Sequence, residues 1–142
     1  MNKRQKGKIL IVDDLQNWRE LLVDILQEDG HQTTTAKNYK EAYALLKARA
    51  KEFDIAVIDM RLIDDSPYNN DGMKILRDAK ALNPLIKAII LTGYPDKDQK
   101  EKSLKFYQAD GYERKVPKGT SFDIDKFSGF IFNLLQSQNA SA

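Results

Sequence analysis

Apolar positions along this chain follow two alternating periods. Short apolar runs, typical of strands, are each followed by a longer segment in which apolar residues recur every three or four positions. The runs predict five strands, at Lys8–Asp13, His31–Thr35, Asp54–Ile58, Ile86–Leu91 and Gly111–Arg114. The segments predict five helices, at Leu15–Glu28, Tyr39–Ala50, Gly72–Leu82, Lys97–Gln108 and Asp123–Gln136. Strict alternation with short connections predicts an α/β fold, in which helices cover both faces of a parallel sheet.

Residues at the element boundaries agree with this division. Gly30 tolerates the left-handed conformation that often ends a helix, and Asn83-Pro84 cannot continue one. Asn38 and Asp71 are suited to cap the helices that follow them. Because no repeat, low-complexity segment or linker interrupts the pattern, we expect one domain with short tails. The predicted division is a flexible basic tail at 1–7, the domain at 8–137 and a disordered tail at 138–142.

Composition excludes several classes of function. The 23 basic and 21 acidic residues leave a net charge of +2, too small to steer the chain toward nucleic acid. No apolar run is long enough for a membrane span or resembles a signal peptide. The chain has no cysteine, so it has neither a disulfide framework nor a thiolate metal site. We therefore expect a cytoplasmic protein without membrane or direct nucleic-acid contacts.

Two adjacent carboxylates follow the first predicted strand. The run Ile9–Val12 is apolar throughout, as in a strand buried on both faces, and leads directly into Asp13 and Asp14. Ligand sites of open α/β sheets lie at the carboxyl ends of the strands, and Mg²⁺ prefers oxygen ligands. The pair therefore suggests a Mg²⁺ site. By itself this segment leaves a second interpretation open, in which Asp14 is only the N-cap of the next helix.

A third carboxylate, Asp59, follows the third predicted strand. Alone, it is more typical of a turn in which an aspartate bonds its own backbone. If the first and third strands are neighbours, however, three acids converge and raise one another's pKa values unless a cation neutralises them. With two acids on the metal, the third can act as a nucleophile and form an aspartyl phosphate.

The last two predicted strands add a hydroxyl and an ammonium group at the same edge. The fourth strand leads into Thr92, and the fifth contains Tyr112 and is followed by Lys115. A threonine hydroxyl can donate a hydrogen bond to a phosphoryl oxygen, and a lysine binds phosphate as a point charge. Together with the three acids, these groups form a complete set for phosphoryl transfer.

The order of these residues resembles the receiver domain of two-component response regulators. The resemblance extends from about Lys8 to Gln136 and rests on Asp13-Asp14, Asp59, Thr92 and Lys115. It implies a flavodoxin-like fold, with five parallel strands in the order 2-1-3-4-5, two helices on one face and three on the other.

The resemblance also implies roles for the acids. Asp59 would accept a phosphoryl group from a histidine kinase or a histidine phosphotransfer protein. Asp13 and Asp14 would hold Mg²⁺ together with Asp59 and the backbone carbonyl of Arg61.

The remaining roles concern reading the phosphorylated state. Lys115 would pair with the phosphoryl group and Thr92 would move to bond it. Tyr112 matches an aromatic switch position on the face formed by the fourth helix, fifth strand and fifth helix. The fourth helix has almost nothing to bury in its first half, Lys97–Ser103. It is either merely solvated or a segment whose position can be biased by phosphorylation.

The sequence differs from the family pattern at two places. The loop Met60–Asn70, between Asp59 and Asp71, is several residues longer than usual; it either shields the acyl phosphate, contacts a partner or has grown neutrally. In addition, Val116 separates Lys115 from the proline that normally follows it through a cis bond. A cis bond before Val116 would cost about 3 kcal/mol, so the bond is trans or the loop is rearranged.

The preferred function is thus a signalling receiver that catalyses only its own phosphorylation and dephosphorylation. It would be a stand-alone protein or part of a longer one, with phosphorylation-dependent dimerisation as an option. The alternative is a binding module of the same fold that works without phosphorylation. A metal-dependent phosphatase is disfavoured, because such enzymes need a second acid where this chain has Arg61. Trp18, one helical turn after Asp14, is predicted to report Mg²⁺ binding by fluorescence.

Overall fold

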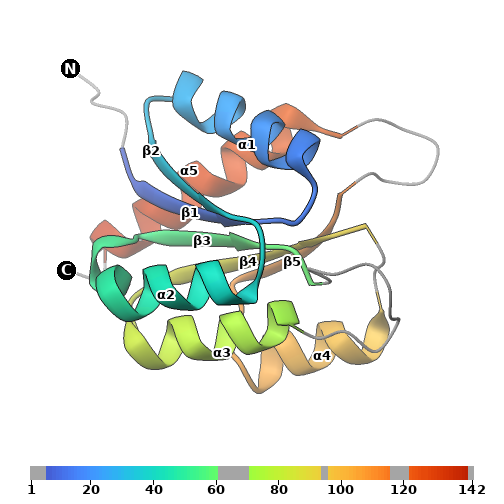
Figure 1. The fold of residues 1–142 in the computed structure, drawn as a ribbon. Coiled ribbons are helices and arrows are strands. Elements are labelled where there is room, and N and C mark those ends of the chain that lie inside the picture. Colours follow the sequence, from blue (N-terminus) through green and yellow to red (C-terminus); the bar gives the residue numbers. More distant parts are fainter. Residues whose placement is uncertain (1–5, 61–70, 94–95, 116–121, 141–142) are drawn as a thin grey trace.

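The computed structural model describes residues 6–60, 71–93, 96–115 and 122–140 (Figure 1). Its strands are β1 (Lys8–Val12), β2 (Gln32–Ala36), β3 (Ile55–Ile58), β4 (Lys87–Thr92) and β5 (Gly111–Arg114). Its helices are α1 (Gln16–Glu28), α2 (Tyr39–Arg49), α3 (Asp71–Leu82), α4 (Lys97–Lys105) and α5 (Ile124–Ala140), with a short 3₁₀ turn, η1, at Ala50–Glu52. The predicted alternation of strands and helices is confirmed.

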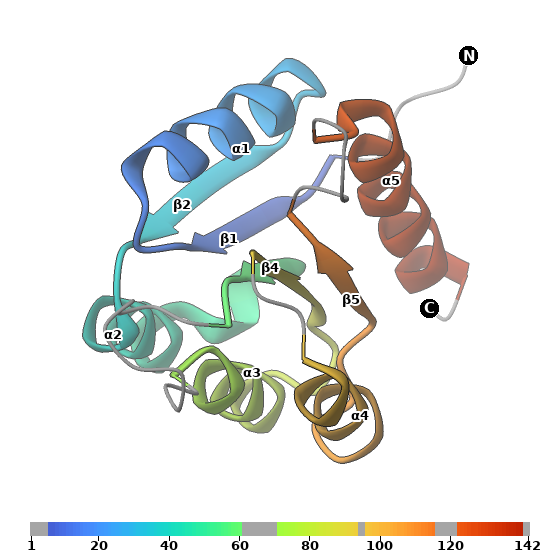
Figure 2. The same ribbon diagram turned by 90° about the vertical axis from the view of Figure 1, so that its right-hand side faces the viewer.

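The five strands form one parallel sheet in the order β2-β1-β3-β4-β5. Helices α1 and α5 cover one face, and α2, α3 and α4 cover the other (Figure 2). This is the predicted flavodoxin-like arrangement. The chain leaves β1 for β2 on one side and later places β3 on the other, which creates the crevice where such sheets bind ligands. In the described part of the chain, no helix has the length and apolar character needed to span a bilayer.

Strand β1 is apolar from Ile9 to Val12 because both of its faces are buried there. Ile9 and Ile11 pack into the core beneath α1 and α5, whereas Leu10 and Val12 pack into the core beneath α2 and α3. All four are at most 1% exposed, so neither face of the strand accommodates a polar side chain. The first polar residues after the run therefore lie at the sheet edge.

Several helix and strand ends differ from the prediction. His31 lies outside β2 because its N–H is committed to the carbonyl of Leu26 at the end of α1. Helix α4 ends at Lys105 rather than Gln108, since Gln108 adopts a positive φ of 58° that terminates it. Helix α5 continues to Ala140, past the predicted end at Gln136, because neither glycine nor proline follows to stop it. The predicted tail at 138–142 thus begins inside a helix.

The helix caps were predicted with mixed success. Asn38 is the N-cap of α2 and accepts the N–H of Glu41 at 2.8 Å, as predicted. Asp14 is not a cap: Leu15 occupies that position of α1, without a side-chain capping bond. Asp71 is the first residue of α3 rather than its cap. Gly30 has a φ of +92° and ends the turn after α1, as predicted.

The amino-terminal edge of the domain begins slightly before Lys8. The N–H of Gly7 donates to His31 Nδ1 at 3.1 Å, and its carbonyl accepts the N–H of Gln32 at 3.0 Å. These bonds attach Gly7 to β2, so the last residue of the predicted tail is part of the fold.

Candidate functional site

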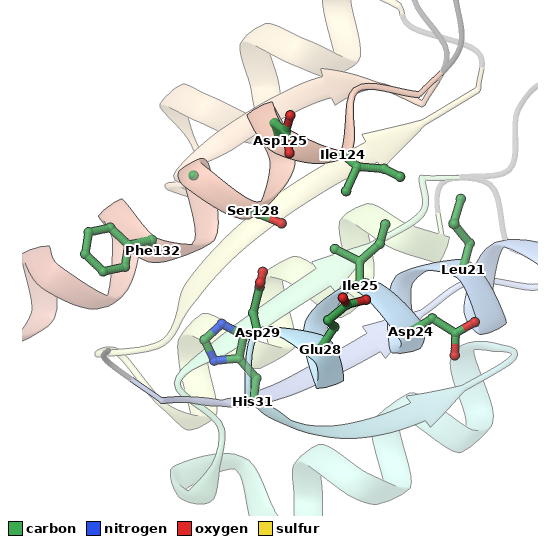
Figure 3. Close-up of a pocket in the computed structure, with 11 residues that line it drawn as sticks. Leu21, Asp24, Ile25, Glu28, Asp29, His31, Ile124, Asp125, Ser128 and Phe132 are labelled. Carbon is green, nitrogen blue, oxygen red and sulfur yellow. The ribbon is translucent and has the colours of Figure 1, made fainter. Parts of the chain in front are cut away.

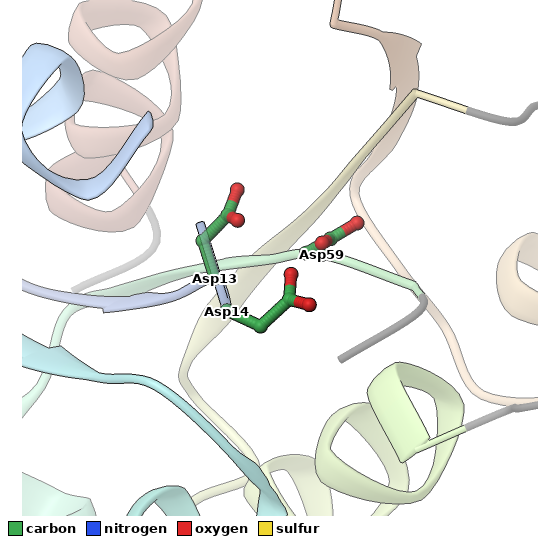
Figure 4. A group of neighbouring side chains, drawn as sticks. All are labelled: Asp13, Asp14 and Asp59. Atoms are coloured by element: carbon green, nitrogen blue, oxygen red, sulfur yellow. The ribbon is translucent and has the colours of Figure 1, made fainter. Parts of the chain in front are cut away.

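Three carboxylates meet at the carboxyl edge of the sheet (Figure 4). Asp13 and Asp14 follow β1 directly, and Asp59 follows β3. The pairing of Val12 with Ile58 brings the two strand ends level, and the N–H of Asp59 extends the ladder to the Val12 carbonyl at 2.8 Å. One ligand oxygen from each acid lies within 4.8 Å of the others. The predicted convergence of the three acids is confirmed.

Asp13 is held by several contacts. Its Oδ1 accepts the N–H of Leu15 at 3.0 Å, so this carboxylate also bonds the backbone at the start of α1. The Arg19 guanidinium, one turn further along α1, donates to the Asp13 carbonyl at 2.8 Å. Asp13 and Asp59 are 2% and 6% exposed, whereas Asp14 is half-buried. The site therefore has two acids that are largely shielded from water and one that faces it.

Lys115 brings a buried ammonium into the same site. Its Nζ lies 2.7 Å from Asp13 Oδ2 and 3.4 Å from Asp59 Oδ2, and the residue is 4% exposed. The N–H of Lys115 donates to the carbonyl of Thr92 at 2.8 Å, which extends the β4–β5 ladder to this point. The lysine thus reaches the acids even though Val116, and not proline, follows it.

Burial makes these acids hard to ionise together. It raises the pKa of Asp59 from 3.8 to about 7, and the charges of Asp13 and Asp14 add to that effect, while Lys115 opposes it. Burial also raises the pKa of Asp14, with a further contribution from Asp13. The three acids and the lysine together carry a net charge of −2 when all are ionised. A divalent cation would neutralise that charge, so the residues present fit Mg²⁺.

Thr92 and Tyr112 complete the set of predicted residues in the described structure. Thr92 is the last residue of β4 and is fully buried. Tyr112, on β5, is 7% exposed. Its hydroxyl accepts the N–H of Asp96 at 3.1 Å and donates to the Asp96 carbonyl at 3.4 Å. Since Asp96 is the N-cap of α4, this tyrosine connects β5 to the start of that helix.

Three predictions fall outside the described residues. They concern the backbone carbonyl of Arg61, the long loop after Met60 and the bond between Lys115 and Val116. They remain predictions.

Comparison with known proteins decides the family. The model of the response regulator receiver domain matches residues 9–118, a span that includes the three acids, Thr92, Tyr112 and Lys115. The chain belongs to the response regulator receiver family.

Two curated relatives show how such a receiver domain occurs in other proteins. The chain is 32% identical over 96 residues to sporulation initiation phosphotransferase F of Bacillus subtilis, covering 68% of this chain and 72% of that protein. It is 33% identical over 97 residues to the transcriptional regulatory protein ZraR of Klebsiella oxytoca, covering 68% of this chain but only 20% of that protein.

Solved structures agree on the fold. A response regulator receiver domain protein from Clostridium thermocellum superimposes with a TM-score of 0.80 at 27% identity, covering 96% of this chain and 99% of that one. A CheY-like receiver domain protein from Methanospirillum hungatei gives 0.78 at 26% identity, covering 96% and 98%. Receiver domains are signalling domains that obtain phosphate from histidine kinases or phosphotransfer proteins, and they generally bind Mg²⁺ at an acidic pocket.

Two features of this receiver domain were missed from the sequence. Trp18 was singled out only as a reporter, yet the Lys115 Nζ lies 5.1 Å from the centre of its ring. Arg19 was not singled out at all, although it bonds the Asp13 carbonyl. The available signal was helical spacing: both residues lie about one turn after Asp14, on the helix that the acids precede.

The receiver also has a groove of about 730 Å³ between α1 and α5 (Figure 3). Its walls combine acids such as Asp24, Glu28 and Asp125 with apolar side chains such as Phe132. None of the predicted site residues line it. The groove is therefore separate from the acid cluster at the strand ends.

Proposed function

We propose that this receiver domain accepts a phosphoryl group on Asp59 in a Mg²⁺-dependent reaction. The donor would be a histidine kinase or a histidine phosphotransfer protein. The observation that carries the proposal is the position of the Lys115 ammonium, between Asp13 and Asp59. A lysine this close to the acids repels a bound cation, so it is unfavourable in a site that only holds a metal. It suits a site that must hold the cation and then an additional anion.

The transfer itself requires little from the protein beyond positioning and charge. A carboxylate oxygen of Asp59 attacks phosphorus, and the bond from phosphorus to the donor's imidazole nitrogen breaks. The electron pair stays on that nitrogen, and Asp59 becomes an acyl phosphate. Attack of water on phosphorus later releases inorganic phosphate and restores the carboxylate. Asp59 must be ionised to attack, and the neighbouring Lys115 favours that form.

The other site residues have the following roles in this proposal. Mg²⁺, held by Asp13, Asp14, Asp59 and the Arg61 carbonyl, would neutralise charge on the phosphoryl oxygens. Lys115 exchanges its carboxylate partners for a phosphoryl oxygen, and the Thr92 hydroxyl donates to another.

The output would be a shift in the face formed by α4, β5 and α5. Two observations support this. The Tyr112 hydroxyl bonds the backbone of Asp96, at the start of α4. Within α4 itself, the one buried residue is Ser103, so the helix has few contacts that resist displacement.

Phosphorylation is tested with acetyl phosphate and Mg²⁺, followed by intact mass. We expect one phosphoryl group on the wild-type protein, none on Asp59→Asn and none after EDTA. Asp125→Asn, an exposed acid on α5, is the matched control and should be modified like wild type. An unmodified wild-type protein that is still folded would favour the phosphorylation-independent binding module. Modification of Asp59→Asn would place the acceptor elsewhere.

Other expectations remain predictions from the sequence alone. They are the absence of direct nucleic-acid binding, the cytoplasmic location and phosphorylation-dependent dimerisation.

A further inference from the structure

The ammonium of Lys115 has three neighbours of different chemistry. Two are the carboxylates of Asp13 and Asp59, at 2.7 and 3.4 Å. The third is the ring of Trp18, whose centre lies 5.1 Å from Nζ. This distance is within the range of cation–π attraction, which is strongest for tryptophan. Because Lys115 is 4% exposed, little water weakens the contact.

The Trp18 ring is itself fixed by aromatic packing. Phe122, just before α5, meets it edge-on, with ring centres 5.4 Å apart and an interplanar angle of 89°. Phe122 in turn packs against Phe127 of α5 at 5.6 Å. Trp18 is therefore held between the first turn of α1 and the start of α5, where it can act as a fixed surface for a flexible lysine.

Metal binding makes this surface important. Asp13 and Asp59 are both candidate ligands of a divalent cation, so a bound cation would reduce their attraction for the ammonium and add its own repulsion. Of the three neighbours described above, the Trp18 ring is the one that cannot ligate Mg²⁺. Its attraction for Lys115 persists at the stage when the phosphoryl group arrives.

We propose that Trp18 is a positioning residue for Lys115, which keeps the ammonium at the acid cluster while the cation occupies the carboxylates. This inference rests on the proposed phosphorylation of Asp59. The Lys115 side chain would then bind the incoming phosphoryl group without first having to change its conformation. The contact between Trp18 and Lys115 is thus proposed to increase the rate of phosphorylation, and not to stabilise the fold.

The kinetic test compares Trp18→Phe and Trp18→Leu, with Phe132→Leu on α5 as a control for loss of an aromatic side chain. Phosphorylation by acetyl phosphate and Mg²⁺ is followed by intact mass, and thermal unfolding is recorded for each variant. We expect the rate to fall about twofold for Trp18→Phe and about tenfold for Trp18→Leu, in the order of cation–π strength. Phe132→Leu should react at the wild-type rate.

The kinetic result can contradict the proposal without contradicting the proposed function. If wild type is phosphorylated and Trp18→Leu reacts as fast, Trp18 does not position Lys115. The same conclusion holds if Trp18→Phe and Trp18→Leu lose the same share of the rate and this loss follows their loss of thermal stability. A cation–π role requires that phenylalanine, which keeps an aromatic ring, retains more of the rate than leucine.

A second measurement needs neither metal nor phosphoryl donor. Trp18 is the single tryptophan of the chain, so its emission in EDTA reports its own surroundings. Removing the ammonium in Lys115→Met should change that emission, whereas Lys115→Arg, which keeps a cation, should change it less. Identical emission in wild type and Lys115→Met would show that ring and ammonium are not in contact, whatever the outcome of phosphorylation.

Discussion

Asp59 combines two properties that oppose each other in the absence of a metal. It is 6% exposed, which favours its neutral form, yet it lies beside Lys115, which favours its charged form. Burial is the larger effect and sets the pKa at about 7. A carboxylate that titrates near neutrality is destabilising once ionised, and that cost is what a bound cation would relieve.

The pH dependence of stability follows from this residue. The pKa of Asp59 in the folded protein lies above the unfolded value of 3.8. Protonated Asp59 therefore contributes fully to the free energy of unfolding below pH 3.8, and this contribution is lost as the pH rises through about 7. In EDTA, Asp59→Asn should therefore be more stable than wild type at pH 8, by up to about 4 kcal/mol. The difference should shrink toward pH 5. Urea unfolding at several pH values measures it, and a constant difference would contradict the assignment.

At the scale of the elements, two helical glycines have opposite surroundings. A Cβ on Gly72, in the first turn of α3, would overlap the Asp59 carbonyl oxygen and lie 2.6 Å from Met60 Cα. A Cβ on Gly129, within α5, would meet nothing within 4 Å. Gly72 is thus required by the close approach of α3 to the backbone beside Asp59, whereas Gly129 has no packing requirement in the described structure.

Alanine at the two positions should have opposite effects. Gly129→Ala should stabilise the protein by about 0.5–1 kcal/mol, since alanine favours the helix and fits without a clash. Gly72→Ala should destabilise it by about 1–3 kcal/mol, because the backbone must shift to make room. Urea unfolding distinguishes them. Destabilisation by Gly129→Ala would mean that this side of α5 is packed more closely than described.

Helix α4 has the fewest buried residues of the five α-helices in the described structure. Its N-cap, Asp96, accepts the N–H groups of Asp98 and Gln99 at 2.8 and 3.1 Å. On the inner side, the buried Gln99 Oε1 and Ser103 Oγ have no hydrogen-bond partner among the described residues. Such groups are costly to bury, so the helix gains little from its contact with the sheet.

Loss of this cap should therefore act locally. Asp96→Ala should cost about 1 kcal/mol and accelerate amide exchange within α4 about fivefold, with little change in global unfolding. Asn38→Ala, at the cap of α2, is the control: it should lower global stability, because α2 packs closely against α3. Hydrogen exchange with mass detection measures both. Equal global losses would show that α4 unfolds only with the whole domain.

At the scale of the molecule, Mg²⁺ binding would be linked to folding, because the three acids of the candidate site come together only when β1 and β3 are adjacent. Mg²⁺ at about 100 times its dissociation constant should add about 2.7 kcal/mol and raise the melting temperature by about 5–10 °C. Asp13→Asn should abolish most of that shift, whereas Asp125→Asn should retain it. Scanning calorimetry with and without Mg²⁺ is the measurement, and an equal shift in Asp13→Asn would refute the site.

The sequence by itself determined most of the elements and the location of the acids. Apolar runs such as Ile9–Val12 must be buried on both faces, so the polar residues after them can only lie at the sheet edge. The family resemblance supplied the strand order, and the fold confirmed it. These properties follow from local patterns, because the period of side chains and the strand ends are set along the chain itself.

Only the tertiary structure decided which side chains meet. Asp14 could have been a cap, but Leu15 has that position and the Asp13 carboxylate bonds the Leu15 backbone instead. The position of the Trp18 ring near Lys115 depends on the rotamers of residues far apart in sequence and on packing against Phe122. No period along the chain encodes such a contact. The contact forms only when the fold brings the end of β5, which leads into Lys115, close to the first turn of α1, which carries Trp18.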